Sequence, residues 1–280
     1  MPAAFRLALA LALALAQGRP MTNSNGLLVE TPEPGNRDHD FFNRDNTIYV
    51  PGREFMYSYA IHKGTTELYC RVDAADDPAT KSWTLVERTA ADPLTIRHLG
   101  FTVLAGYGGM DDLFPDYSQT IIQQKYWSGE GKLLFDGSTG LIENGANVWI
   151  HPFRGKYFSV TELSPFPFAK FPLEKGKSWT WRLDDIDGRW SDPRIVAYEG
   201  KVAASYRYEI VGKETLETPL GKLDCAVIEA TAQSRLGSSR LRSHFNTAYG
   251  FIRLEYRNLD GSRIVLELQK VTDGRPASGD

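Results

Sequence analysis

The heptapeptide ASYRYEI, residues 204–210, decides the fold class. Apolar residues at its even positions alternate with Ser205, Arg207 and Glu209 at its odd positions. Successive side chains of a β-strand point to opposite faces, so this period of two predicts a strand with one apolar face and one charged, wet face. The same alternation recurs at 240–245, 252–257 and 264–268. The repetition predicts an antiparallel sheet that is covered on one side.

Turn signals separate the apolar runs along the whole chain. Asn144-Gly145 and Asp260-Gly261 are hairpin pairs, because both residues tolerate the positive φ angles of tight turns. Further turns are predicted at HKGTT 62–66, SGEGK 128–132, FDGSTG 135–140 and TAYG 247–250. No segment reads as a helix of three turns. We therefore predict an all-β fold, a strongly curved antiparallel sheet in the form of a half-barrel or open barrel.

The domain organisation follows from the same signals. A polar, extended lead-in is expected over 17–46, and an N-terminal β-meander over 47–163 with a long loop at 90–118. Three prolines in SPFPFAKFP, 164–172, break a strand and favour an extended connection. A curved β domain follows over 164–272, with a flexible tail at 273–280. The two β regions are expected as subdomains that share one sheet.

The first residues have the layout of a secretory signal peptide. Arg6 precedes an apolar run from Leu7 to Ala16, and Ala14-Leu15-Ala16 forms a small-residue cleavage site. This run is too short for a comfortable transmembrane helix. The expectation is a signal peptide at 1–16, cleavage near Ala16, a periplasmic or extracellular protein, and no transmembrane segment.

Charge and composition exclude one class of partner. The net charge is −3 over 280 residues, with 24% charged and 12% aromatic residues. A nucleic-acid-binding protein would normally carry a basic face, so no nucleic-acid partner is expected. The high aromatic content favours β structure instead.

Four segments in the C-terminal half carry a resemblance to a known module. They are Pro172, Leu173, Gly176 and Trp179; Thr218, Pro219 and Gly221; Cys225 and Ile228; and Gly250, Phe251 and Ile252. In order and spacing they resemble a TapB-like module of secreted and lipid-anchored bacterial proteins, over residues 171–270 only. The resemblance implies a curved antiparallel sheet similar to lipoprotein carriers of the LolA type. It implies no known catalytic residues.

Chemistry-bearing residues give few signals for a reaction. The five histidines lie outside metal-ligand spacing of one another, and no G-x-S-x-G motif occurs, so we predict no metal, cofactor or catalytic residue. DDIDGRWSD, 184–192, lacks the further ligands of a calcium loop and is interpreted as a turn capped by its aspartates. In an oxidising compartment Cys70 and Cys225 either pair or remain buried thiols.

Aromatic residues are the remaining candidates for a site. Trp179 and Trp181 share one strand face, as do Tyr206 and Tyr208, and the loop at 101–117 adds Tyr107 and Phe114. Trp179 is expected as a core anchor, and Trp181 is expected to reach a concave face. The hypothesis is non-enzymatic binding of a hydrophobic or amphipathic molecule by these residues, against the alternative that they only fill a core.

Two further classes of function are also consistent with the sequence. A secreted glycan hydrolase would use paired carboxylates such as Asp111, Asp112, Asp185 or Asp187. A structural or partner-binding module of the cell envelope would need no small-molecule site.

Overall fold

The computed structural model describes residues 20–31, 41–72, 83–106, 119–188 and 192–274. Its N-terminal strands are β1 (Met21–Ser24), β2 (Leu27–Glu30), β3 (Glu54–Lys63), β4 (Thr66–Val72), β5 (Trp83–Glu87), β6 (Ile96–Val103), β7 (Thr120–Ser128), β8 (Leu133–Glu143), β9 (Asn147–Ile150) and β10 (Phe168–Lys170). The C-terminal strands are β11 (Ser178–Asp187), β12 (Lys201–Thr218), β13 (Gly221–Ser234), β14 (Gly237–Asn246), β15 (Gly250–Arg257) and β16 (Arg263–Thr272). Two short 3-10 helices are η1 (Arg88–Ala90) and η2 (Lys156–Leu163).

Fourteen of these strands form one antiparallel sheet. Its order is β10-β9-β8-β7-β6-β3-β16-β15-β14-β13-β12-β11, and β4 branches from β3 and pairs with β5. The last strand, β16, pairs with β3 and so joins both halves of the chain in one sheet. The hairpin β1–β2 forms a separate two-stranded sheet. The prediction of an all-β, antiparallel fold is confirmed.

The alternation that predicted the strands also places the core. In β12, Val202, Ala204, Tyr206, Tyr208 and Ile210 are buried, and the residues between them are largely exposed. The two hairpins predicted from sequence are present, since Glu143 pairs with Val148 and Arg257 with Arg263. Gly261 has a φ of +78°, a conformation that few residues other than glycine adopt readily.

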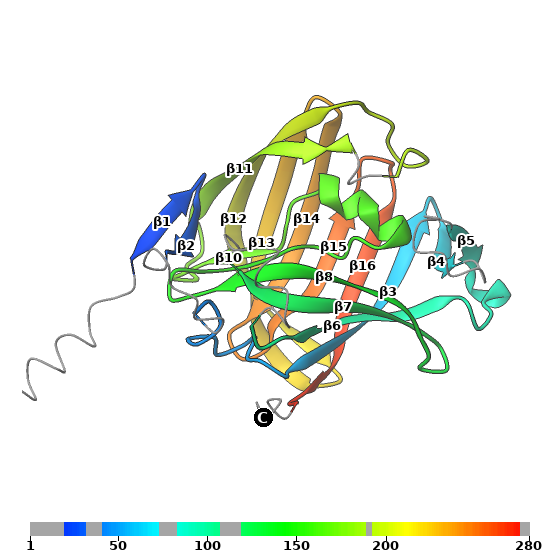
Figure 1. The fold of residues 1–280 in the computed structure, drawn as a ribbon, viewed down its shortest axis with the longest axis horizontal. Coiled ribbons are helices and arrows are strands. Elements are labelled where there is room, and N and C mark those ends of the chain that lie inside the picture. Colours follow the sequence, from blue (N-terminus) through cyan, green and yellow to red (C-terminus); the bar gives the residue numbers. More distant parts are fainter. Residues whose placement is uncertain (1–19, 32–40, 73–82, 107–118, 189–191, 275–280) are drawn as a thin grey trace, which may run out of the picture.

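Side chains at the two ends of the long sheet contact one another. In Figure 1, β6–β10 lie in front of β12–β16. Phe168 on β10 packs edge-on against Trp179 on β11, with ring centroids 5.5 Å apart. Trp149 on β9 packs against Trp181 at 5.7 Å. No hydrogen-bonded strand pair joins β10 to β11 in the described residues, so side chains rather than backbone pairing hold these ends together.

The hairpin β1–β2 packs where those two ends meet. The Leu28 amide donates to Asn147 Oδ1 at 3.0 Å, and Asn144 and Asn147 both donate to the Leu28 carbonyl at 3.1 Å. Gly26 has a φ of +109°, and a Cβ at this position would lie 2.1 Å from the carbonyl oxygen of Thr180 on β11. The hairpin therefore bridges β9 and β11, and Gly26 permits the close approach.

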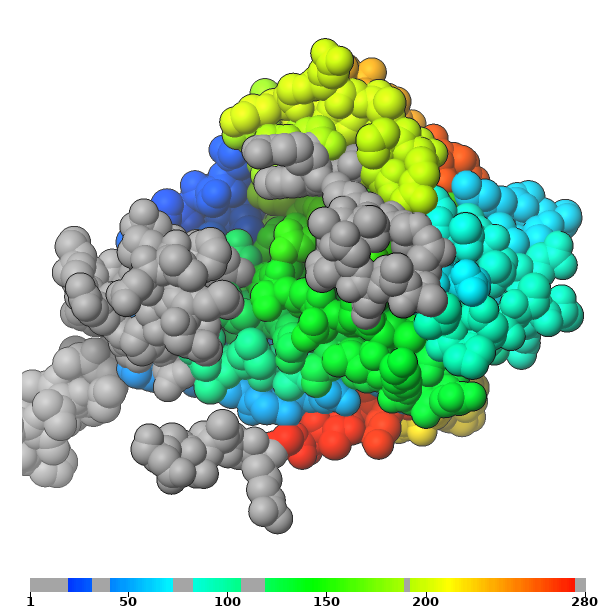
Figure 2. All heavy atoms as spheres, turned by 45° about the vertical axis from the view of Figure 1, so that its right-hand side comes forward, coloured from blue at the N-terminus to red at the C-terminus, as the bar shows by residue number. Residues whose placement is uncertain are grey.

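The segment that contains η2 lies inside the folded sheet. Phe158 packs edge-on against Tyr59 of β3 at 5.0 Å, and Tyr157 packs against Trp83 of β5 at 5.0 Å. From Tyr157 to Leu163 every residue is buried. Figure 2 shows the green surface of β7, β8 and their neighbours below the yellow-green surface of the β11–β12 connection. The cyan surface of β4 and β5 lies to the right of this green surface.

Several local predictions differ from the structure. FDGSTG, 135–140, forms part of β8 rather than a turn, because its residues pair with β7 from Tyr126 to Ile121. Within DDIDGRWSD, Asp184, Asp185 and Asp187 belong to β11, where a bulge between Leu183 and Ile186 shifts the register. The proline-rich stretch 164–172 contains the short strand β10, whose Phe168 pairs with Trp149.

Other differences concern segments that were expected to lack strands. The expected polar lead-in contains β1 and β2, and the expected loop at 90–118 contains β6. Cys70 and Cys225 are both buried free thiols, and burial raises the pKa of Cys70 to about 12. The expected signal peptide at 1–16, residues 107–118 and the end of the expected tail lie outside the described residues.

Candidate functional site

Four of the predicted site residues form two stacked pairs between neighbouring strands. Trp179 lies directly opposite Tyr208, and Trp181 lies opposite Tyr206. The first pair is parallel within 2° at a centroid distance of 5.3 Å, and the second is tilted by 21° at 4.8 Å. All four side chains are buried on the interior face. Tyr107 and Phe114, the other two predicted residues, lie outside the described part of the chain.

Residues from the opposite end of the sheet cover these pairs. Phe166 packs against Trp181 at 5.3 Å and against Tyr206 at 6.1 Å. The imidazole of His151 contacts Phe166 at 4.9 Å and lies 6.1 Å from Trp149. The Tyr208 hydroxyl donates to the Phe166 carbonyl at 3.1 Å, which ties the crossing segment to β12. The predicted aromatics thus belong to one continuous cluster inside the fold.

A buried acid and a histidine border this aromatic cluster. His151 Nε2 lies 3.3 Å from Glu162 Oε2, and the Glu162 side chain is 2% exposed. Burial raises the pKa of Glu162 to about 8, although Arg154 opposes that shift. Burial, followed by the charge of Arg154, lowers the pKa of His151 to about 3. Both side chains are therefore neutral at pH 7.

The neutral pair has a consistent hydrogen-bonding assignment. His151 Nδ1 lies 3.1 Å from the Pro152 carbonyl, which can only accept, so Nδ1 carries the proton and Nε2 keeps a lone pair. A protonated Glu162 can donate to that lone pair. In the structure Nε2 and Glu162 Oε2 lie close together, but their alignment is not that of a hydrogen bond.

Several buried polar atoms of this region have no hydrogen-bond partner within the described residues. They are Trp149 Nε1, Ser159 Oγ, Glu162 Oε2, Trp179 Nε1 and Tyr206 Oη. An unsatisfied buried polar group costs about 1–3 kcal/mol, so folded proteins hold only a few of them. Burial also raises the pKa of Tyr206, which keeps its hydroxyl protonated. Two indole N–H groups, a phenol and a carboxylic acid therefore present donors to an otherwise aromatic surrounding.

Sequence reasoning did not single out His151, Glu162, Trp149 or Phe166 as site residues. A usable signal was present in KYFSVTELSPFPF, 156–168, where Glu162 is the one acidic residue in a segment rich in apolar and aromatic residues. Its neighbours Val160 and Leu163 are buried, so a carboxyl group there must also be buried. His151 directly follows the buried run Val148–Ile150. The contact between the two residues depends on the sheet topology and is not visible in the sequence.

The hydrolase candidates Asp185 and Asp187 lie on β11, close in sequence to Asp184 and Asp192. Asp184 pairs with Arg182, and Asp185 pairs with Lys201, with both carboxylates more than half exposed. Asp192 is buried and accepts a hydrogen bond from Trp83 Nε1 at 2.7 Å and from Arg194. Asp111 and Asp112 lie outside the described residues. Within the ranges that the structure describes, no three His, Cys, Asp or Glu side chains gather as they would around a metal ion.

The structure also bears on the membrane question. Among the residues described, none of the helices has the length and apolar character required to cross a bilayer.

Comparisons with known proteins find similarity in structure only. No protein-family model and no curated protein sequence matches the chain. Similar solved structures include an inferred exported protein with a YmcC-like fold from Bacteroides fragilis, at 13% identity and a TM-score of 0.43, over 80% of this chain and 97% of that one. An inferred lipoprotein from Parabacteroides distasonis shows 11% identity and a TM-score of 0.40, over 81% and 97%. The hypothetical lipoprotein YmcC from Escherichia coli shows 13% identity and a TM-score of 0.34, over 81% and 90%.

Proposed function

We propose that this chain is an exported, non-enzymatic binding protein that holds one hydrophobic or amphipathic small molecule against the aromatic interior of its sheet. The sheet serves as a half-barrel around that molecule. Export is supported by Arg6 and the apolar run from Leu7 to Ala16. The interior is supported as the site by one observation above all, the buried polar atoms without partners on Trp149, Glu162, Trp179 and Tyr206.

The chemistry of these atoms defines the kind of ligand. Aromatic rings bind the apolar body of a molecule, and a few polar groups fix its orientation. Neutral donors from Tyr206, Trp149 and Glu162 suit an ester, amide or carboxyl oxygen at the polar end of the ligand. A cationic ligand fits less well, since Glu162 is uncharged at neutral pH.

The segment η2 is the part of the interior that would move to admit the ligand. A 3-10 helix of eight residues is unusually long, because its hydrogen-bond geometry is poorer than that of an α-helix. Lys156 at its first position has a φ of +57°, which is uncommon for a residue other than glycine. Two of the unpartnered atoms, on Ser159 and Glu162, belong to this helix. We therefore assign η2 as the cover of the binding site.

The proposal is tested with a fluorescent fatty acid, cis-parinaric acid, titrated into the purified protein while energy transfer from tryptophan is recorded. Binding is expected in the wild type, and weaker binding in Tyr206→Phe and Glu162→Met, which remove one hydrogen-bond donor each and keep the approximate length of the side chain. Glu217→Gln, an exposed change at the tip of the β12–β13 hairpin, is the matched control. Equal binding by all four proteins would place the ligand elsewhere, and absence of binding by the wild type would contradict the proposal.

A further inference from the structure

The outer face of the sheet, opposite the aromatic interior, carries a row of arginines that crosses five strands. Arg207 pairs with Thr231, Thr231 with Arg240, Arg240 with Arg257, and Arg257 with Arg263. These residues are direct cross-strand partners, so their side chains leave the sheet side by side. Like charges directly opposite each other destabilise a sheet. Three consecutive arginines in one row therefore repel each other unless an anion lies between them.

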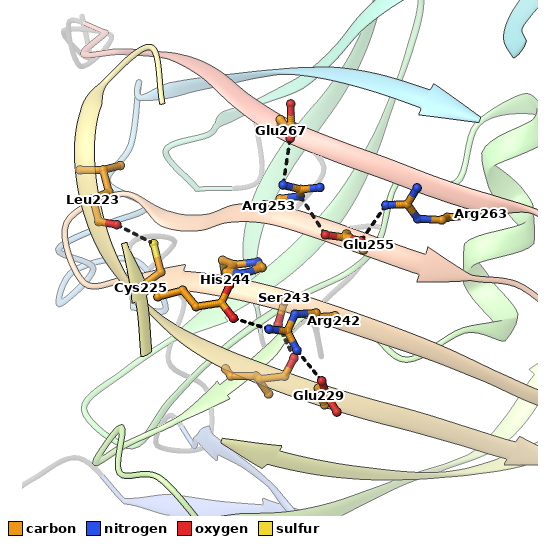
Figure 3. Close-up of polar contacts among 12 residues, drawn as sticks. Leu223, Cys225, Glu229, Arg242, Ser243, His244, Arg253, Glu255, Arg263 and Glu267 are labelled. Atoms are coloured by element: carbon orange, nitrogen blue, oxygen red, sulfur yellow. Dashed lines mark hydrogen bonds and ion pairs between the residues drawn. The ribbon is translucent and has the colours of Figure 1, made fainter. Parts of the chain in front are cut away.

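The glutamates of this face form ion pairs mainly with arginines outside the row. Figure 3 shows that Arg242 binds Glu229 and that Arg253 lies between Glu255 and Glu267. Arg263, at the end of the row, binds Glu255 at 2.9 Å (Figure 3). The acids thus lie one or two rows away along the strands, where they neutralise Arg242, Arg253 and Arg263.

Three members of the row remain without an acidic partner. Arg207, Arg240 and Arg257 are exposed, and in the described part of the chain none of them forms an ion pair or a side-chain hydrogen bond. Neighbouring strands lie about 4.8 Å apart, so Arg240 and Arg257 are adjacent. Arg207 lies two strands from Arg240, at roughly 10 Å. The arrangement is an adjacent pair of guanidinium groups with a third in line.

These arginines line a groove on the outer face with a volume of about 430 Å³. Its walls contain five arginines, Arg207, Arg240, Arg242, Arg257 and Arg263, and three glutamates, Glu209, Glu229 and Glu255. Five positive charges less three negative charges leave the groove at +2, in a protein whose total charge is −3. The volume falls within the range of about 300–1,000 Å³ that is typical of small-molecule sites.

We infer that this groove binds a phosphate-bearing molecule, with the phosphate held between Arg240 and Arg257 and with Arg207 beside the rest of the ligand. A guanidinium group presents a planar fork of donors that matches phosphate oxygens. A phosphate dianion neutralises two adjacent arginines at once, whereas a single carboxylate neutralises only one. The site lies on the opposite face of the sheet from the aromatic interior, so it is independent of the ligand proposed there. The phosphate belongs either to a soluble molecule or to a lipid headgroup.

Calorimetric titration with inorganic pyrophosphate tests the inference on the full chain. Arg240→Gln combined with Arg257→Gln is expected to weaken binding by about tenfold or more, because both charged hydrogen-bond donors to the phosphate are lost. Lys132→Gln with Lys175→Gln, two exposed changes of equal charge outside the groove, is expected to bind as the wild type does. Sulfate at equal ionic strength is expected to bind more weakly than pyrophosphate.

A second arm identifies the source of the phosphate. Vesicles with phosphatidic acid in phosphatidylcholine are compared with pyrophosphate in solution, and retention on the vesicles that needs Arg240 and Arg257 assigns a lipid headgroup. Binding of pyrophosphate alone assigns a soluble ligand. Thermal unfolding checks the variant fold, since removal of facing like charges should not lower stability. Equal binding by the arginine variant and the lysine control, or no binding of either probe, would overturn the inference.

Discussion

The indole ring of Trp181 stacks on the phenol ring of Tyr206, with centroids 4.8 Å apart and planes 21° apart. The two residues are direct partners on β11 and β12, and Phe166 and Trp149 cover Trp181 from the far end of the sheet. Trp181 therefore connects the last strand of the sheet order to β9 and to the segment that precedes β10. We propose that this aromatic interior both holds the sheet together and forms the binding site.

Replacement of Trp181 by alanine should lower the free energy of unfolding by about 3–5 kcal/mol, the usual loss for a large aromatic side chain in a core. Urea unfolding followed by circular dichroism measures the change. Leu133→Ala, at a side chain that is 44% exposed, is the control and should change stability by about 0.5 kcal/mol or less. A loss below about 1 kcal/mol for Trp181→Ala would show that the two sheet ends do not depend on this contact.

Glu143 holds the loop before β3 through backbone amides. Its carboxylate accepts hydrogen bonds from the amides of Thr47, Ile48 and Tyr49 at 2.8–2.9 Å. Glu143→Gln retains the shape but loses the charge and one acceptor, so we expect a loss of about 1.5–3 kcal/mol in the free energy of unfolding. Chemical denaturation is the measurement, with exposed Glu217→Gln as the matched control. Equal stability of the two variants would contradict this role.

Gly26 and Gly64 form a natural pair for a backbone test. Both have positive φ angles, of +109° and +61°, but only Gly26 has a backbone oxygen, that of Thr180, in the way of a Cβ. Gly26→Ala should detach the β1–β2 hairpin, whereas Gly64→Ala should cause only the local strain of its φ angle. Hydrogen exchange at the Leu28 amide, which donates to Asn147, reports detachment. Protection of that amide in Gly26→Ala would show that the hairpin tolerates the added carbon.

The buried carboxyl of Glu162 should make stability depend on pH. Its folded-state pKa of about 8 exceeds the ordinary value of 4.5, so the folded protein keeps a proton that the unfolded chain releases. The contribution of Glu162 is fully present below pH 4.5 and declines as the pH rises to about 8. Glu162→Gln removes this decline, so its stability relative to the wild type should rise from pH 5 to pH 8 and then level off.

Urea unfolding of Glu162→Gln and wild type across that pH range measures the difference, with Glu217→Gln as the control that should show no trend. His151 acts in the opposite direction, because its pKa is lowered to about 3 and its contribution is lost as the pH falls below 6.5. Measurements above pH 6.5 therefore isolate Glu162. A difference that stays constant from pH 6.5 to pH 9 would mean that Glu162 is already ionised in the folded protein.

Local periodicity predicted much of the fold. The alternation around Tyr206 and Tyr208 placed both residues on the buried face, and Asp260-Gly261 marked a hairpin. FDGSTG was misread because turn-forming residues also occur in strands when a neighbouring strand satisfies the backbone, as β7 does for β8. The pairing of β16 with β3 joins residues about 200 positions apart in the chain, and no local pattern encodes such a contact.

The site was predictable only in part, for the same physical reason. The pairs Trp179–Tyr208 and Trp181–Tyr206 combine residues that alternation had already placed on apolar faces. Glu162 and His151 meet only because the segment after β9 returns through the interior, and their pKa shifts arise from that burial. The arginine row likewise depends on the register of β12–β16, which sets Arg240 beside Arg257 and Arg263.

Native mass spectrometry shows directly whether the aromatic interior holds a ligand. The chain is exported to a bacterial periplasm, purified without detergent, and weighed intact before and after extraction with organic solvent. We expect the wild type to carry an added mass of lipid size that leaves on extraction. This added mass should be reduced in Tyr206→Phe and retained in the double variant Arg240→Gln with Arg257→Gln. A protein with only the mass of its own sequence before extraction, in wild type and variants alike, would contradict a ligand in the aromatic interior.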